Sequence, residues 1–142
     1  MKLPKVRDAD FFNSLGRGYL PGDLGMRVTE VAARSVAAQL DIEKRHLAPN
    51  GYLHAGAVVA LADTTAAYAC IVQLPEDADG FTTMELKSNH LGTAREGAVT
   101  CVASPAHLGR TTQVWDARVS SADGRVIALF RCTQLILYPR AG

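Results

Sequence analysis

A single carboxylate stands in the most apolar stretch of the sequence. The segment NGYLHAGAVVALADTTAAYACIV covers residues 50–72, and Asp63 is its only charged side chain. A carboxylate that leaves water without a partner is strongly destabilising or shifts its pKa. One interpretation is catalytic, because a partly desolvated carboxylate has the raised basicity that a nucleophile or a general base needs. The other is structural, with Asp63 capping a neighbouring loop, helped by Thr64 or Thr65.

A histidine and a polar turn precede this carboxylate. His54 stands where the alanine-rich stretch begins, and Asn50 lies in the turn before it. The first N–H groups of a helix lack intrahelical acceptors, so those of Ala55 and Gly56 can polarise a carbonyl or hold an oxyanion. Each feature also has an ordinary explanation, since every helix has such a start and Pro-Asn-Gly is a common turn. A turn histidine with no catalytic role fits His54 equally well.

The spacing within this segment has a consequence for assembly. A helix rises about 1.5 Å per residue, so Ala55 and Asp63 are separated by about 12 Å along its axis. One carbonyl carbon cannot meet both groups of the same chain. If they cooperate, the carboxylate of one chain must reach the helix start of another. The spacing therefore predicts a site between subunits, with a two-fold dimer as the minimum functional unit.

The elements that position these residues follow from composition and periodicity. About eighteen residues after His54 are long and alanine-rich enough for a helix, and seven alanines between residues 55 and 69 suit a helix enclosed by closely approaching backbone. A short helix is expected at residues 8–17 and turns at residues 19–25. Segments rich in Thr, Val and Ile predict strands, with Asp123-Gly124 as a hairpin turn, at residues 26–32, 34–40, 82–91, 98–104, 111–120 and 125–138.

This order predicts an α+β fold in which one antiparallel sheet wraps around a long central helix. The last four strands can pair as a meander. The edge and the outer face of the sheet invite pairing with a second copy.

Length and composition set the protein class. The 142 residues fit a single domain, with residues 1–24 as an N-terminal covering segment. The formal net charge of +1 and the absence of a basic run predict no nucleic-acid partner. Three cysteines without a CxxC pair predict reduced core thiols and no metal site. No signal peptide is visible, and the helix around Asp63 looks too alanine-rich to span a bilayer, so we expect a cytoplasmic protein with no membrane partner.

Here a family resemblance becomes specific. The stretch NGYLHAGAVVALADTTAAYAC resembles the signature of hotdog-fold thioesterases of the phenylacetic-acid-degradation type, in the 4-hydroxybenzoyl-CoA thioesterase superfamily. That signature is G-x-x-H-G-G followed by a helix carrying L-A-D and small residues. The stretches TTMELKSNHLGTAREG, HLGRTTQVWDARV and DGRVIALFRCTQLIL are also similar to the family's strands, so the likeness covers roughly residues 25–138. It implies a hotdog fold, acyl-CoA hydrolysis without a cofactor, and a homodimer at minimum, with a homotetramer expected.

The resemblance also assigns roles to residues. Asp63 would attack the thioester carbonyl or activate water, His54 would orient the helix start or the thioester, and the Ala55 N–H would polarise the carbonyl oxygen. Gly56 matches the second glycine of the signature.

Two positions depart from the family pattern. Ala55 stands where the family has glycine, which keeps the N–H donor and tightens the approach of substrate. Ala48 stands where the family often has Asn or Gln. Either Asn50 substitutes from a shifted loop position, or this polar helper is missing.

The remaining site residues concern the two ends of the substrate. The resemblance places coenzyme A contacts at strand ends or turns, which here means His90, Arg95 and Arg110. The acyl pocket is expected to be lined by strand and helix side chains such as Tyr68, Thr83 and Phe81.

Two other functions stay open. A hotdog hydratase or dehydratase also places a histidine and an acid across a dimer interface, but it adds water to enoyl-CoA without releasing thiol. The signature after His54, and the lack of a proline-rich loop there, favour the thioesterase. A non-catalytic acyl-CoA-binding module is the third candidate, kept open by Ala48 and Ala55.

Overall fold

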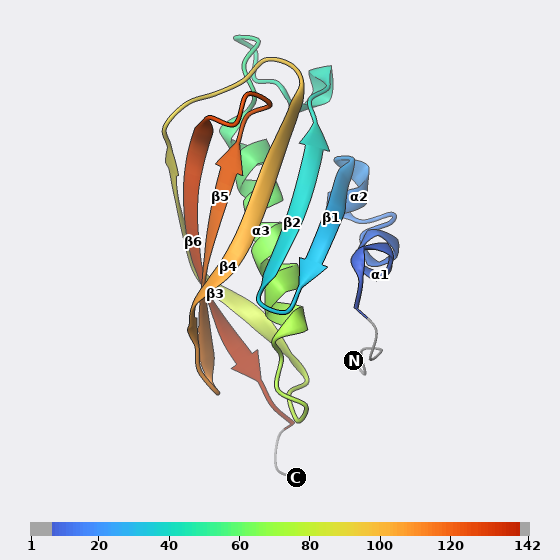
Figure 1. Cartoon of the computed structure of the whole chain (residues 1–142), viewed down its shortest axis with the longest axis vertical. Coiled ribbons are helices and arrows are strands. Elements are labelled where there is room, and N and C mark those ends of the chain that lie inside the picture. Colours follow the sequence, from blue (N-terminus) through green and yellow to red (C-terminus); the bar gives the residue numbers. More distant parts are fainter. Residues whose placement is uncertain (1–6, 140–142) are drawn as a thin grey trace.

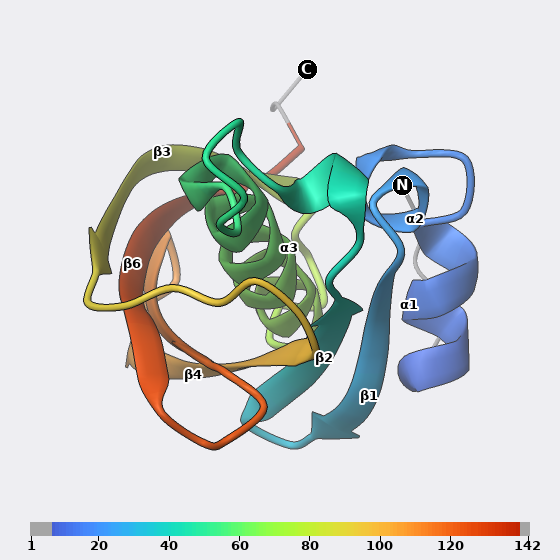
Figure 2. The same cartoon turned by 90° about the horizontal axis from the view of Figure 1, so that it is seen from above.

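A curved antiparallel sheet around one long helix forms the body of the protein (Figure 1). The computed structural model describes residues 7–139. Seen from above, the sheet curves around helix α3, Ala55–Val72, and two short helices lie against the far side of the first strand (Figure 2). The predicted α+β architecture is confirmed. The strands are β1 Met26–Ala32, β2 Ser35–Asp41, β3 Gly80–His90, β4 Ala98–Leu108, β5 Thr112–Ser120 and β6 Val126–Leu137.

The strand order is β1-β2-β4-β5-β6-β3, and this corrects one part of the prediction. Strands β4, β5 and β6 form the expected meander, with Gly124 at φ +82° in the turn after Asp123. Strand β3 does not pair with β4; it pairs with β6 and becomes an edge, while β4 pairs with β2. Periodicity identifies a strand but not its partner. After α3, the chain enters the sheet at the edge opposite β1.

Helix α3 is largely apolar, and the curved sheet covers part of its surface (Figure 2). Half of its eighteen residues are buried: Val58, Leu61, Ala62, Thr65, Ala66, Tyr68, Ala69, Cys70 and Ile71. By length and composition it is the one helix among the described residues that could cross a membrane. Alanine content therefore does not by itself exclude a membrane span for this helix. Core helices of soluble proteins pass the same test, and burial against the sheet accounts for its apolar character.

The N-terminal segment covers the free edge of β1. Helix α1, Ala9–Leu15, is capped by the Asp8 carboxylate, which accepts the Phe11 N–H at 2.9 Å. Residues 19–25 were expected to form only turns, but they contain the short helix α2, Leu20–Asp23, with a proline in its first turn. Residues 1–6 of the predicted covering segment lie outside the described residues.

Candidate active site

The start of α3 presents two hydrogen-bond donors. The Nδ1 atom of His54 accepts the Gly56 N–H at 2.8 Å, and the His54 carbonyl accepts the N–H groups of Ala57 and Val58. Within the described residues, no hydrogen bond occupies the Ala55 N–H. Because Nδ1 is an acceptor, the neutral ring of His54 carries its proton on Nε2, and this ring is exposed. The free donors are therefore Ala55 N–H and His54 Nε2–H, whereas the Gly56 N–H is already used.

The glycine at position 56 makes room for the histidine ring. A Cβ atom there would lie 3.0 Å from His54 Nδ1 and 3.2 Å from Cε1, closer than carbon normally approaches. Any side chain at this position would push the ring away from the cap. The glycine expected from the family signature thus has a direct steric reason in this chain.

The loop before the helix uses Asn50 for its own structure. The Asn50 side-chain oxygen accepts the Tyr52 N–H at 3.1 Å, and Gly51 has φ +80°. The Ala48 N–H donates to the Tyr52 carbonyl at 2.7 Å and closes the turn. Asn50 therefore acts as an ordinary turn residue in this loop. Ala48 has a methyl group where the family often has the amide side chain of Asn or Gln.

A buried histidine that the sequence reasoning missed anchors this loop. His46 is 1% exposed, and its Nδ1 accepts the Glu43 N–H at 2.9 Å. Its Nε2 lies 2.8 Å from the Leu24 carbonyl, to which it donates, and its own carbonyl accepts the His54 N–H at 2.9 Å. The ring therefore ties the start of β1 to the residue that caps α3. No sequence signal separates it from its neighbours Lys44 and Arg45, which point to an exposed charged turn.

Asp63 has no partner for its charge. It is half-buried on α3, its Oδ1 atom is buried, and among the described residues no hydrogen bond or ion pair reaches its carboxylate. Burial raises the pKa of this carboxyl. For the alternative in which Asp63 caps a neighbouring loop with Thr64 or Thr65, the described residues contain no such hydrogen bond from the Asp63 carboxylate, and the Thr65 hydroxyl donates to the Leu61 carbonyl at 2.7 Å.

The thiol beside Asp63 is a poor competitor for catalysis. Burial, with the nearby Asp63 charge as the next cause, raises the pKa of Cys132 to about 12. It therefore stays protonated near neutral pH. Cys70 and Cys101 are also buried and free, so the prediction of reduced core cysteines is confirmed. Asp63 therefore stays the stronger candidate of the two for a nucleophile or base.

The comparison with known families decides the class. Residues 50–128, more than half of the chain, match the model of the thioesterase superfamily. The chain belongs to this superfamily. Its fold is the hotdog fold, and its enzyme class is thioester hydrolase, as the sequence predicted.

Individual relatives agree with this thioesterase assignment. The 1,4-dihydroxy-2-naphthoyl-CoA hydrolase of Escherichia coli (strain K12) is 34% identical over 128 residues, which cover 88% of this chain and 91% of that protein. The crystal structure of a variant of thioesterase PA1618 from Pseudomonas aeruginosa has a TM-score of 0.90 and 32% identity, covering 95% of this chain and 97% of that one. Thioesterase HI1161 from Haemophilus influenzae also reaches 0.90, at 28% identity, covering 97% of this chain and 96% of that one.

The side of the thioesterase between α3 and β3 is open. Leu86 pairs with Cys132 in the strand register and so lies on the same face of the sheet as that buried thiol, yet it is 43% exposed. Met84, at the bulge of β3, is 62% exposed. Large apolar side chains on the inner face of a sheet are normally buried, so nothing in the described part of the chain fully covers this wall.

The predicted coenzyme A contacts lie at opposite ends of the molecule. Arg95 stacks over the Tyr52 ring at 4.1 Å, in a loop joined to the helix start by the Leu53 N–H and the Ala94 carbonyl. His90 ends β3 and leads into that same loop. In contrast, Arg110 bonds to Asp77, just beyond the C-terminal end of α3, at 2.8 Å. The structure thus brings Arg95, but not Arg110, to the helix start of its own chain.

The predicted acyl-pocket residues are also separated. The Thr83 hydroxyl donates to Gln134 at 2.9 Å on the inner face of the sheet, and Phe81 pairs with Ile136 further along the same strands. Tyr68 stacks on Phe12 of α1 with 4.7 Å between ring centroids. Within a single chain, Tyr68 lines a small cavity beside Phe12 that Thr83 does not line. It also lies about 140° around the helix from Asp63.

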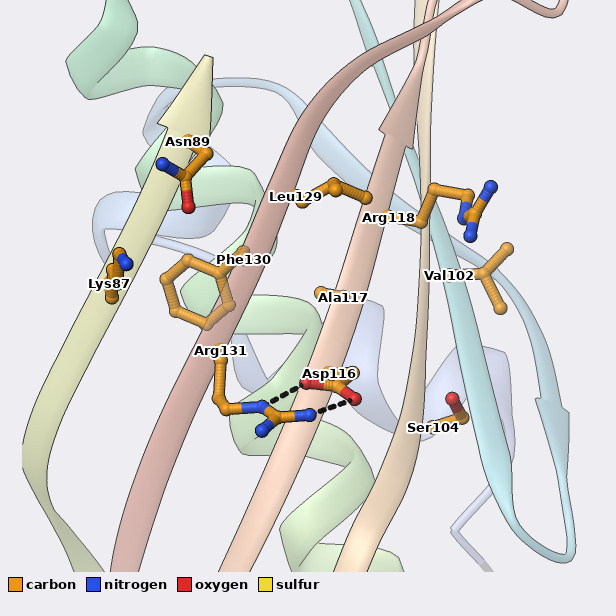
Figure 3. A pocket seen from close by; sticks show the side chains of 10 residues that line it. All are labelled: Lys87, Asn89, Val102, Ser104, Asp116, Ala117, Arg118, Leu129, Phe130 and Arg131. Atoms are coloured by element: carbon orange, nitrogen blue, oxygen red, sulfur yellow. Dashed lines mark hydrogen bonds and ion pairs between the residues drawn. The ribbon is translucent and has the colours of Figure 1, made fainter. Parts of the chain in front are cut away.

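A hollow of about 580 Å³ lies on the outer face of the sheet, away from α3 (Figure 3). Asp116 and Arg131 form a two-point ion pair across it, at 2.6 and 2.8 Å. None of the predicted site residues lines it. Within residues 7–139, no three His, Cys, Asp or Glu side chains gather in a way that could hold a metal ion. The lining residues are Lys87, Asn89, Val102, Ser104, Asp116, Ala117, Arg118, Leu129, Phe130 and Arg131.

Proposed function

We propose that this thioesterase hydrolyses an acyl-CoA thioester to the free acid and CoA, with Asp63 as nucleophile or general base. The observation that carries the proposal is the Asp63 carboxylate, which is buried in part, has a raised pKa and lacks a partner among residues 7–139. Such a group is costly unless it has a function. The CoA hydrolase among the relatives supports a CoA thioester as the substrate class.

The site is proposed to form between two chains. Ala55 and Asp63 are about 12 Å apart along α3, so one thioester cannot contact both in a single subunit. Strand β3 is an edge whose side chains are largely exposed, and it runs antiparallel to its neighbour β6. If β3 pairs antiparallel with its two-fold copy, the two α3 helices run in opposite directions. The start of one helix then approaches the middle of the other. A homotetramer built from two such dimers remains our prediction.

In this arrangement the groups divide the chemistry. The ionised Asp63 of one subunit attacks the carbonyl carbon, or removes a proton from the water that does. The carbonyl oxygen gains negative charge and is stabilised by the partner's helix start, through Ala55 N–H and His54 Nε2–H. The C–S bond then breaks, and CoA leaves as the thiolate. In the nucleophilic route, water hydrolyses the Asp63 anhydride in a second step.

The nucleotide of CoA is proposed to lie near Arg95 and His90, at the same end of the molecule as the helix start. Arg95 is held over Tyr52 and offers a cation there for phosphate. Arg110 keeps its place as a predicted contact, but it is already paired with Asp77. To bind CoA, Arg110 would have to leave the Asp77 carboxylate and pair with a phosphate of the nucleotide.

The test is the Asp63→Asn variant, assayed for free thiol released from acyl-CoA. We expect a folded protein with the oligomeric state of the wild type and a rate reduced about 10³-fold or more, because loss of the catalytic group removes the chemical step. An unchanged rate would overturn the role of Asp63.

Two further measurements separate the rival functions. Hydration of enoyl-CoA without thiol release would instead support a hydratase. If the wild type binds acyl-CoA for hours without cleaving it, the result would support a non-catalytic binding module, the function that Ala48 and Ala55 left open.

A further inference from the structure

A second buried oxygen without a partner among the described residues lies on β3, the edge strand in contact with α3. The Oγ atom of Ser88 is buried and has no hydrogen-bond partner among the described residues, a condition it shares with Asp63 Oδ1. A buried hydroxyl that is left unsatisfied destabilises the fold. A partner from outside the chain is therefore expected at this position.

The strand register places Ser88 on the same side of the sheet as Asp63. The Asp63 charge acts on Cys132, and Cys132 pairs with Leu86 on β3. Ser88 is two residues beyond Leu86, so it faces the same way, about 6.6 Å further along the strand. Its neighbours Lys87 and Asn89 line the hollow on the opposite, outer face (Figure 3).

The surroundings of Ser88 define what its partner must be. Its register partner is the buried Phe130 and Leu86 lies beside it along the strand, so the hydroxyl has apolar neighbours on these two sides, with His90 beyond it on the same face. A hydroxyl can both donate and accept a hydrogen bond. This wall suits a predominantly apolar acyl group that carries one hydrogen-bonding substituent.

We propose that Ser88 is a specificity-determining residue, whose hydroxyl bonds a polar substituent, such as a ring hydroxyl, on the acyl group. This inference rests on the proposed thioesterase site and adds the chemistry of its acyl end. A site built to hydrogen-bond a substrate hydroxyl discriminates strongly against the analogue that lacks it, because the protein group is then left unpaired.

The test compares benzoyl-CoA with its ortho-, meta- and para-hydroxy derivatives. We expect the wild type to prefer at least one hydroxylated isomer, and Ser88→Ala to reduce kcat/KM for that isomer about tenfold. The value for benzoyl-CoA should not change. Ser88→Thr, which keeps the hydroxyl, should retain the preference. Ser104→Ala removes a hydroxyl on the outer face and serves as the matched control.

Binding measurements separate this inference from the catalytic proposal. The dissociation constants of the same compounds are measured by calorimetry on Asp63→Asn and on Asp63→Asn/Ser88→Ala, where turnover plays no part. We expect the hydroxylated isomer to bind about tenfold more weakly only when Ser88 is lost. An equal loss for all four compounds, loss of the dimer, or no change for any isomer would overturn the role of Ser88, whatever the fate of Asp63.

Discussion

The two edges of the sheet are treated in opposite ways. At β1, the Asn13 side chain of α1 donates to the Val28 carbonyl at 3.0 Å and accepts the Val28 N–H at 2.8 Å, as a neighbouring strand would. At β3, no helix of the described chain covers the edge (Figure 2). Met84 and Leu86 on this strand are exposed. Open edges promote strand pairing between molecules, and proteins normally block them. The chain therefore blocks one edge and leaves open the one beside its unpaired carboxylate.

The largest effect is expected from charge placed at the open edge. Met84→Glu puts two carboxylates near each other if β3 pairs with its copy, so the dimer should dissociate and thiol release should fall about 100-fold. Analytical ultracentrifugation and the thiol assay, run over the same protein concentrations, measure both quantities.

The matched control for this variant lies on the blocked side. Tyr19→Glu alters a side chain that is 70% exposed near α2 and should change neither assembly nor rate. A fully active Met84→Glu monomer would contradict the intersubunit site.

The second prediction concerns pH. Burial raises the pKa of Asp63 above the ordinary value of 3.8, and the ionised form is the active one. The kcat/KM should therefore fall about tenfold per pH unit below this raised pKa. The folded state also holds this proton more tightly than the unfolded chain, so Asp63 makes the protein less stable as pH rises through the raised pKa. Asp63→Asn should remove that decline.

Asp116, in the outer hollow, provides the opposite case. Its hydrogen bond with Arg131 lowers its pKa. It stabilises the fold above its ordinary pKa, and that contribution is lost as pH falls through the lowered value. The free energy of unfolding of Asp63→Asn, Asp116→Asn and the wild type is measured with denaturant across pH. The difference between variant and wild type should change with pH in opposite directions for the two variants. A change in the same direction for both variants would show that burial does not raise the pKa of Asp63.

The smallest effect on activity is expected at the blocked edge. Asn13→Ala removes two hydrogen bonds to β1 and should lower the free energy of unfolding by about 1–3 kcal/mol. Thiol release should stay at the wild-type rate, because the change is on the side away from Asp63.

The exposed backbone of β1 should also promote association beyond the wild-type oligomer, measured by light scattering against concentration. Asn89→Ala, at an exposed outer-face position, is the control. A loss of activity equal to that of Met84→Glu would mean that the two edges are not functionally distinct.

Local patterns predicted most of the elements and the central residue of the site. The bounds of α3 and β1 match those expected, and the Asp123-Gly124 hairpin lies between β5 and β6 as predicted. These features depend on contacts close in sequence: alanine content, alternation and turn chemistry. Strand β4 continues through Pro105 to Leu108, beyond the expected end, because its pairing with β5 continues past a bulge there.

Features that depend on distant residues escaped the sequence. His46 is buried because it meets the Leu24 carbonyl, which is 22 positions away. Tyr68 lies under Phe12 because α1 folds back over β1 and α3. Nothing in the sequence distinguishes Ser88 from other polar residues on a strand. The register, in which it pairs with the buried Phe130, places it on the inner face of the sheet.

The sequence by itself determined that a lone carboxylate would sit in an apolar helix, eight residues from a helix start that it cannot share with one substrate. Helical rise and the cost of burying charge depend on nothing beyond that segment. Only the tertiary structure decided which strand is the open edge and which polar atoms beside Asp63 lack partners. Both depend on which strands pair and in what register, and these choices are made by packing between residues far apart in the chain.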